Sequence, residues 1–179
     1  MSLRIIGITG RAGSGKDTLA NTMESEGFQR YSMAEPIKRG IEAMFGFNRD
    51  IWEDRDVKET DLDWLGRSPR YLAQTLGTEW GRDTVHSDLW LLLASKKLAE
   101  CNQIIIPDIR FVNEAKWVVD NGGKVFEVVR PGEDAIPECN HASENGIPLE
   151  YISTYILNNG SVDDFMLRGK RILCSYLYS

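Results

Sequence analysis

Residues 10–18 read Gly10-Arg11-Ala12-Gly13-Ser14-Gly15-Lys16-Asp17-Thr18, and this stretch with its flanks decides the fold. The run before it, residues 3–9, is short, apolar and rich in β-branched side chains. After it, Leu19, Ala20 and Met23 recur at the spacing of one helix face. The pattern predicts a strand, a glycine-rich loop and a helix, in that order.

The spacing G-x-x-x-x-G-K is typical of a phosphate-binding loop, or P-loop. Glycines allow positive φ and a close approach, so backbone N–H groups can point at phosphate oxygens. The N-terminus of the following helix also favours an anion, and Lys16 can reach the β- and γ-phosphates. An ordinary strand-to-helix turn needs neither the lysine nor the fixed glycine spacing. The predicted nucleotide-binding residues are Arg11, Gly13, Ser14, Gly15, Lys16, Asp17 and Thr18.

Asp17 departs from the usual P-loop pattern, in which a Ser or Thr that ligates Mg²⁺ follows the lysine. A carboxylate is also a good hard-oxygen ligand for Mg²⁺, directly or through a water. Alternatively, Asp17 is an acid in the first turn of a helix, where the helix dipole stabilises negative charge. Both interpretations remain open, and Thr18 follows as a second oxygen donor.

Composition indicates one globular domain. The chain has 179 residues, of which 42% are hydrophobic and 27% charged. It has no apolar run of the roughly 20 residues that span a bilayer and no signal-peptide pattern, so we expect a cytoplasmic protein without a membrane partner. The formal net charge of -6, without a long basic run, argues against binding to a nucleic-acid polymer.

Strand patterns alternate with helix patterns along the chain, which predicts right-handed βαβ units and a parallel sheet. The expected fold class is α/β, a P-loop kinase-like three-layer α/β/α domain with a helical acceptor-binding lobe at about 34–100 and a short lid at about 130–148. Residues 47–70 have poor periodicity, and we expect them to be irregular or short-helical. Further strands are expected at 28–32, 103–108, 124–129 and 155–157, and further helices from 34 to 45, at 69–80, 88–99 and 112–120, and from 162 onward.

Polar residues follow several predicted strands, where ligands gather in a parallel sheet. They are Asp108 with Arg110, then Arg130, then Asn158. Asp108 is suited to the hydration shell of Mg²⁺, and Arg110 offers a planar fork to phosphate. The alternative is a structural Asp–Arg pair that positions a loop.

The expected acceptor lobe carries the cations Lys38, Arg70 and Arg82, which could hold a second phosphate in line with the first. Arg67 in the same lobe is more typical of a solvated surface charge. Residues 141–144 lie in a polar segment with Gly and Pro, which is either a lid over the nucleotide or a helix start with Ser143 as its cap.

Taken together, these motifs resemble the bacteriophage deoxynucleoside monophosphate kinases, within the P-loop nucleoside monophosphate kinases. The order of the motifs is more specific than any one of them, and it covers most of the chain. The resemblance is carried by Gly15-Lys16-Asp17-Thr18, Ala34-Glu35-Pro36-Ile37-Lys38, Arg70 with Gln74-Thr75-Leu76-Gly77-Thr78-Glu79 and Arg82, Asp108-Ile109-Arg110-Phe111 with Asn113-Glu114-Ala115, Arg130, and His141-Ala142-Ser143-Glu144.

The resemblance implies transfer of the ATP γ-phosphoryl group to a deoxynucleoside 5′-monophosphate, with ATP and Mg²⁺ required. Positioning and charge neutralisation would carry the catalysis, without a general base. Lys16, Arg110 and Arg130 would be catalytic; Asp17, Thr18 and Asp108 would place Mg²⁺; and Lys38, Arg70, Gln74, Thr78, Arg82 and Arg110 would bind the acceptor.

Three other functions share the P-loop. Dephospho-coenzyme A kinase and animal-type phosphomevalonate kinase have the same architecture but a different acceptor lobe. A non-enzymatic P-loop switch would hydrolyse nucleotide slowly without an acceptor. The presence of cations both near the P-loop and in the expected acceptor lobe argues against such a switch. The pattern does not determine which base the acceptor carries or whether the chain forms a homodimer. The expected partners are nucleotide substrates.

Overall fold

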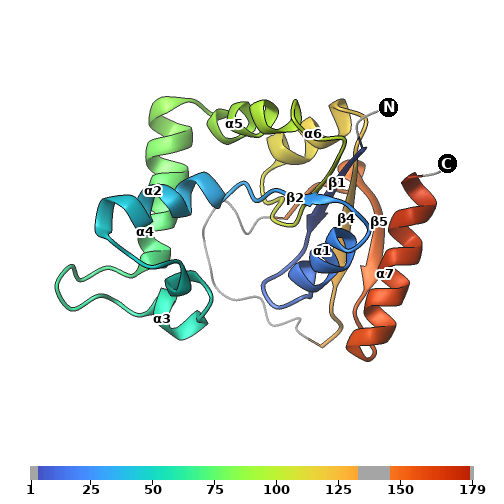
Figure 1. The fold of residues 1–179 in the computed structure, drawn as a ribbon, viewed down its shortest axis with the longest axis horizontal. Helices are drawn as coiled ribbons and strands as arrows, with labels where there is room; N and C mark the ends of the chain where they lie inside the picture. Colours follow the sequence, from blue (N-terminus) through green and yellow to red (C-terminus); the bar gives the residue numbers. More distant parts are fainter. Residues whose placement is uncertain (1–3, 133–145, 178–179) are drawn as a thin grey trace. The chain divides into compact units, whose positions relative to one another are not determined.

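The computed structural model describes residues 4–132 and 146–177, and it contains a five-stranded parallel sheet (Figure 1). The strand order is β2-β3-β1-β4-β5, so the P-loop strand β1 lies in the middle. Every strand pair is parallel, which confirms the predicted α/β class. The strands are β1 Arg4–Thr9, β2 Gln29–Arg30, β3 Gln103–Ile106, β4 Lys124–Val129 and β5 Ile152–Leu157.

The part of the chain that forms the sheet includes the helices α1 Lys16–Glu24, α6 Val112–Asp120 and α7 Val162–Leu177, with a short 3₁₀ turn η4 at Leu149–Tyr151. α1 and α7 cover one face, where Leu19, Phe165 and Leu173 pack with buried sheet residues such as Ile8 and Phe126. α6 contacts β1 and β4. Alternating strand residues therefore face two apolar layers, which gives the three-layer arrangement.

The close fit on the α6 face explains Gly7 in the middle of β1. A Cβ added at Gly7 would lie 3.1 Å from Ile109 Cγ1 and 3.4 Å from Val118 Cγ2. A larger residue would push α6 away from the sheet. Across the described residues, 4–132 and 146–177, no helix has both the length and the apolar character needed to cross a membrane.

The chain divides into two compact units: residues up to Ser32 together with those from Ser95 onward, and Met33–Ala94. The second unit has its own core of Ile37, Ile41, Trp52 and Trp90. α5 begins in this unit and continues past Ala94. The elements of the second unit are α2 Glu35–Phe45, η1 Arg49–Trp52, α3 Arg55–Glu59, α4 Pro69–Thr75, the π-helix η2 Leu76–Val85 and the start of α5 Leu89–Leu98.

The helix expected at 69–80 changes type partway. α4 ends at Thr75, and the wider η2 follows. Two glycines explain the local packing: Trp90 Nε1 donates to the Gly77 carbonyl at 2.8 Å, and a Cβ added at Gly81 would lie 2.5 Å from Trp90 Cζ2. The indole ring therefore occupies space that any side chain at position 81 would need.

Helical spacing in the sequence predicts that Met44 in α2 and Leu92 in α5 face the core. Met44 is 62% exposed and Leu92 is 51% exposed, so this prediction is wrong for both residues. The buried side of α5 is formed by Trp90, Leu91 and Ala94 instead. Leu89 and Leu93 pack partly buried against the core, so periodicity placed them correctly; because residues 89–93 are all apolar, it could not exclude Leu92.

Candidate active site

The P-loop connects Thr9 at the end of β1 to Lys16 at the start of α1. Gly10 and Gly15 have φ values of 137° and 108°, which L side chains rarely adopt. A Cβ at Gly10 would lie 2.4 Å from the Val128 carbonyl oxygen, so this position accommodates only glycine without rearrangement. The sequence pattern and the backbone geometry thus agree on a tightly wound glycine loop, a conformation suited to an anion.

Lys16 is held over this loop. Its Nζ donates to the Gly10 carbonyl at 2.6 Å and to the Arg11 carbonyl at 2.5 Å. Ser14 is 2% exposed, and its Oγ has no hydrogen-bond partner within the described part of the chain. An ammonium beside a glycine loop is a charge arrangement that suits a polyphosphate.

The residues that follow β4 and β5 form hydrogen bonds with backbone carbonyls of the loop. Asn158 Nδ2 donates to the Ser14 carbonyl at 2.8 Å, and Arg130 donates to the Gly13 carbonyl at 3.3 Å. Phe165 of α7 packs so closely that a Cβ at Gly15 would lie 2.9 Å from its ring. Arg130 and Asn158 therefore do lie at the P-loop, as their positions after strands predicted.

Asp108 follows β3, and β3 lies directly beside β1. The Ile109 amide donates to the Ile8 carbonyl at 3.1 Å, which ties the end of β3 to the strand before the loop. Ser32 Oγ donates to Asp108 Oδ2 at 2.6 Å and orients the carboxylate. The sequence analysis gave Ser32 no role, because no local pattern links two residues so far apart.

Glu114 is a second residue that the sequence analysis left without a role of its own. It is 1% exposed, and its Oε2 accepts hydrogen bonds from the amides of Arg110 at 2.7 Å and Phe111 at 3.1 Å. This carboxylate fixes the backbone that carries Arg110. A Glu three residues after Phe111, the residue before the expected helix, is a capping signal that could have indicated it.

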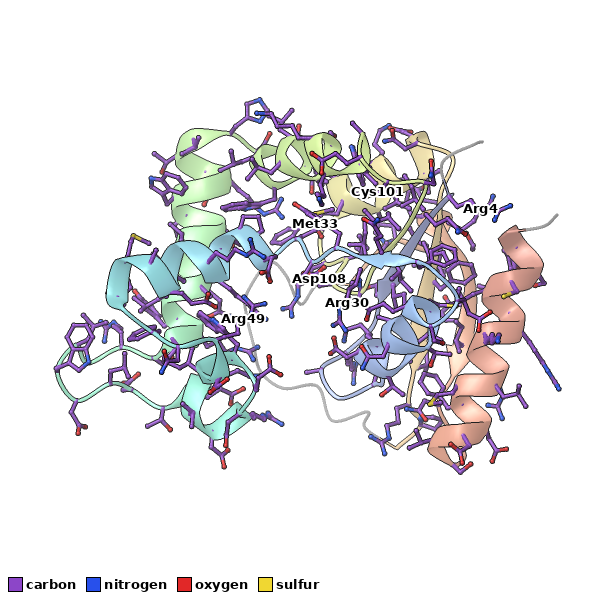
Figure 2. All side chains as sticks on the ribbon, viewed as in Figure 1. Arg4, Arg30, Met33, Arg49, Cys101 and Asp108 are labelled. Atoms are coloured by element: carbon purple, nitrogen blue, oxygen red, sulfur yellow. The ribbon has the colours of Figure 1, made fainter. Side chains whose placement is uncertain are left out.

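Asp17 forms an ion pair with Arg30 of β2. The same guanidinium donates to Asn21 Oδ1 at 2.7 Å. No sequence pattern assigned a role to Arg30. Figure 2 labels Arg30 and Asp108. Thr18, the next residue, is half-buried, and its carbonyl accepts from Thr22 Oγ1 at 2.9 Å.

Glu127 of β4 is another half-buried carboxylate near the loop. Burial raises its pKa above the ordinary glutamate value, and the positive charge of Arg11 opposes that rise only in part. Its register partners are Thr9 on β1 and Tyr155 on β5. This group is less disposed to carry charge than an exposed glutamate.

Within the second unit, the expected acceptor residues lie on three helices. Lys38 of α2 places its ammonium 5.8 Å from the centre of the Trp52 ring. Arg70 at the start of α4 pairs with Glu59 at 3.2 Å, and Arg82 of η2 donates to the Ser87 carbonyl at 3.4 Å. Gln74 on α4 and Thr78 on η2 are half-buried.

The start of α2 holds a charge network. Arg49 pairs with Glu35 at 2.5 Å and with Glu42 at 3.1 Å, and Arg39 pairs with Glu35 at 2.7 Å. Burial alone would raise the pKa of Glu35, but the hydrogen bonds and charges of Arg49 and Arg39 lower it overall. The network fixes the first turn of α2, which also carries Lys38.

The expected lid at about 130–148 falls mostly outside the described residues. Residues 133–145, with the motif 141–144, are the part that lies outside them.

Two curated proteins are similar to this chain over most of its length. A putative deoxynucleotide monophosphate kinase of Acanthamoeba polyphaga mimivirus is 32% identical over 182 residues, which cover 90% of this chain and 91% of the relative. A deoxynucleoside-5′-monophosphate kinase of Escherichia phage T5 is 28% identical over 222 residues, which cover 86% of this chain and 89% of the relative.

Solved structures show the same fold at low sequence identity. TT1252 from Thermus thermophilus has a TM-score of 0.54 and 20% identity, with 98% of both chains covered. A dephospho-CoA kinase from Campylobacter jejuni has a TM-score of 0.54 and 15% identity, with 97% of both chains covered. The deoxynucleotide monophosphate kinase family itself matches residues 57–168. With this match and the similarity to the mimivirus relative, the chain belongs to the deoxynucleotide monophosphate kinase family.

Proposed function

We propose that the chain transfers the γ-phosphoryl group of ATP to a deoxynucleoside 5′-monophosphate, giving ADP and the deoxynucleoside diphosphate. The observation that carries the proposal is a G-x-x-x-x-G-K loop, with Lys16 over it and Asp108 after the neighbouring strand, in a chain of this kinase family. The mimivirus and phage relatives are named for the same acceptor class.

For the donor, we propose that the amides of the loop and Lys16 bind the β- and γ-phosphates. The ammonium now lies on two loop carbonyls, and phosphate oxygens would replace these as stronger, charged acceptors. Arg130 supports this role because its contact with Gly13 places a guanidinium at the loop. Arg11, Ser14 and Gly15 complete the proposed donor site.

In the transfer itself, the bond between the γ-phosphorus and the oxygen bridging to the β-phosphate breaks. A bond forms from the γ-phosphorus to an oxygen of the acceptor phosphate, which is already ionised at neutral pH. The chain therefore needs cations at the equatorial and leaving oxygens rather than a base. Lys16, Arg110 and Arg130 are the residues that we propose for this.

The oxygen donors around the loop suit Mg²⁺, which commonly takes one or two carboxylates together with substrate phosphates and water. Asp17 and Thr18 lie in the first turn of α1, and Asp108 ends the strand next to β1. We propose these three residues as the ones that hold the ion. When bound, Mg²⁺ neutralises charge on the donor phosphates.

For the acceptor, we propose that Met33–Ala94 is the acceptor-binding lobe. Arg70 and Lys38 supply positive charge for the monophosphate, and Arg110 contributes from a backbone that Glu114 holds in place. Gln74 and Thr78 are half-buried polar side chains, suited to hydrogen bonds with a base. Arg82 adds a further cation on η2.

A coupled assay of ADP release tests the proposal. ATP and Mg²⁺ are supplied with dAMP, dGMP, dCMP or dTMP, with the ribonucleotides, with dephospho-coenzyme A or with phosphomevalonate, and without an acceptor as the control. We expect ADP release that depends on one or more deoxynucleoside monophosphates. Turnover with dephospho-coenzyme A alone, or hydrolysis that no acceptor changes, would overturn the proposal.

A further inference from the structure

Arg30 is a cation that the proposed mechanism does not use. It ends the edge strand β2, and its guanidinium faces three residues of α1. It forms an ion pair with Asp17, donates to Asn21 Oδ1 at 2.7 Å, and lies 3.9 Å from Glu24 Oε2. Since these residues are spaced by four and three positions, they line one side of the helix.

We propose that Arg30 is a resident counter-ion of Asp17 that the divalent metal ion displaces. Its positive charge would then set the Mg²⁺ concentration at which the nucleotide–metal complex forms on the enzyme. This inference rests on the proposed function, because it takes Asp17 as a metal ligand. It adds a residue of β2 to a site otherwise built from the P-loop, α1 and the end of β3.

The geometry allows the exchange without unfolding the strand. The Asp17 side chain is 77% exposed, so a hydrated ion can approach it, whereas the Arg30 side chain is only 30% exposed. When Asp17 turns to the metal, the guanidinium keeps its hydrogen bond to Asn21 and has Glu24 as a second carboxylate nearby. Arg30 therefore stays anchored beside the ion. Its positive charge lowers the affinity of the Asp17 site for the divalent metal ion.

Asp108 is prepared differently. Ser32, two residues after Arg30, offers it a neutral hydroxyl at 2.6 Å. A hydroxyl orients a carboxylate without bringing a positive charge to it. A change in the charge at Arg30 should therefore act through Asp17, and it can be tested separately from the geometry at Asp108.

The experiment measures metal binding directly. Mn²⁺ is titrated by EPR into enzyme saturated with a non-hydrolysable ATP analogue, without an acceptor. We expect Arg30→Gln to bind Mn²⁺ roughly three- to tenfold more tightly than wild type, because a nearby positive charge is removed. Arg30→Lys, which keeps the charge, should stay close to wild type. Arg171→Gln on the exposed surface of α7 removes one positive charge elsewhere and should change nothing.

A second pair of variants tests the same idea without altering the arginine. Glu24→Gln removes the alternative carboxylate, so Arg30 should hold Asp17 more firmly and Mn²⁺ should bind about two- to threefold more weakly. Glu26→Gln is the matched control, because Glu26 lies on the same stretch but pairs with Lys170 at 2.5 Å. We expect no change in that variant.

Unchanged or weaker Mn²⁺ binding in Arg30→Gln, with the fold verified by circular dichroism, would overturn the inference. If Arg30→Gln does not fold, equal Mn²⁺ binding by Glu24→Gln and Glu26→Gln would overturn it. These outcomes are distinct from failure of the proposed function, since acceptor-dependent ADP release by the wild type is measured separately. A chain that is an active kinase but shows no effect of Arg30 on metal binding would refute this inference alone.

Discussion

Lys16 separates catalysis from folding at the level of one residue. Its ammonium donates to the carbonyls of Gly10 and Arg11, while positive-φ glycines shape the loop itself. We expect Lys16→Ala to lower kcat by roughly a hundredfold or more, because charge on the moving phosphoryl group is no longer neutralised. Steady-state kinetics and thermal unfolding check this. A loss of folded protein comparable to the loss of activity would contradict it.

Arg70 should act on the acceptor alone. We expect Arg70→Ala to raise the KM for the monophosphate about tenfold or more, with the KM for ATP little changed, because one phosphate contact is lost. Arg70 also pairs with Glu59 at 3.2 Å, so Glu59→Gln is the matched control. If Glu59→Gln has the same effect, the ion pair rather than acceptor binding explains the result.

Glu127 makes stability depend on pH. Burial raises its pKa in the folded chain, so its contribution is fully present below the pKa of the unfolded state and is lost as pH rises through the folded-state pKa. At pH 7 the buried charge therefore destabilises the fold. We expect Glu127→Gln to raise Tm by about 1–3 °C at pH 7 and much less at pH 4.

Calorimetry at both pH values measures this difference. Glu150→Gln, on the exposed turn η4, controls for the loss of one negative charge. A Glu127→Gln variant that is less stable at pH 7 than at pH 4, relative to wild type, would mean that the attraction to Arg11 outweighs burial.

At the scale of the element, η2 depends on its glycines. A side chain at position 81 would need the space of the Trp90 ring, which lies 2.5 Å from the position of the added Cβ. We expect Gly81→Ala to destabilise the fold by about 1–3 kcal/mol, because the ring is part of the core of the second unit. Urea unfolding measures the change.

Gly40 in α2 offers a matched control for the substitution at Gly81 in η2. A Cβ there would meet Leu76 Cδ2 at 3.6 Å, an ordinary contact. Gly40→Ala should therefore be neutral or stabilising by up to about 1 kcal/mol, since alanine favours a helix over glycine. Equal destabilisation by both substitutions would show that the Trp90 contact does not determine the effect.

At the scale of the whole molecule, nucleotide binding should stabilise the folded chain. A ligand present at about 100 times its Kd adds roughly 2.7 kcal/mol, which corresponds to a rise in Tm of about 5–10 °C for a chain of this size. We expect this shift with a non-hydrolysable ATP analogue and Mg²⁺. Lys16→Ala should lose most of it, and a shift of the same size in that variant would place the nucleotide elsewhere.

The sequence alone was sufficient for the P-loop, the parallel α/β sheet and the position of Asp108 directly after a strand. These features depend on local spacing: glycine positions, short β-branched runs, and acids directly after strands. The same reasoning failed in α5, where an unbroken apolar run has no preferred side. It also could not foresee that α4 gives way to η2, since that change accompanies the packing of Trp90 against Gly77 and Gly81.

The tertiary structure alone decided which side chains support the loop and its carboxylates. Arg30 reaches Asp17 across 13 residues of chain and Ser32 reaches Asp108 across 76; for Asn158, expected at this edge of the sheet, the structure adds the partner, Ser14, across 144. Local periodicity holds no information on such pairs, because they arise only when β2 and β3 are placed on one side of β1 and β4 and β5 on the other. The covalent spacing of the P-loop determines its own conformation, whereas its polar environment follows from the order of the strands.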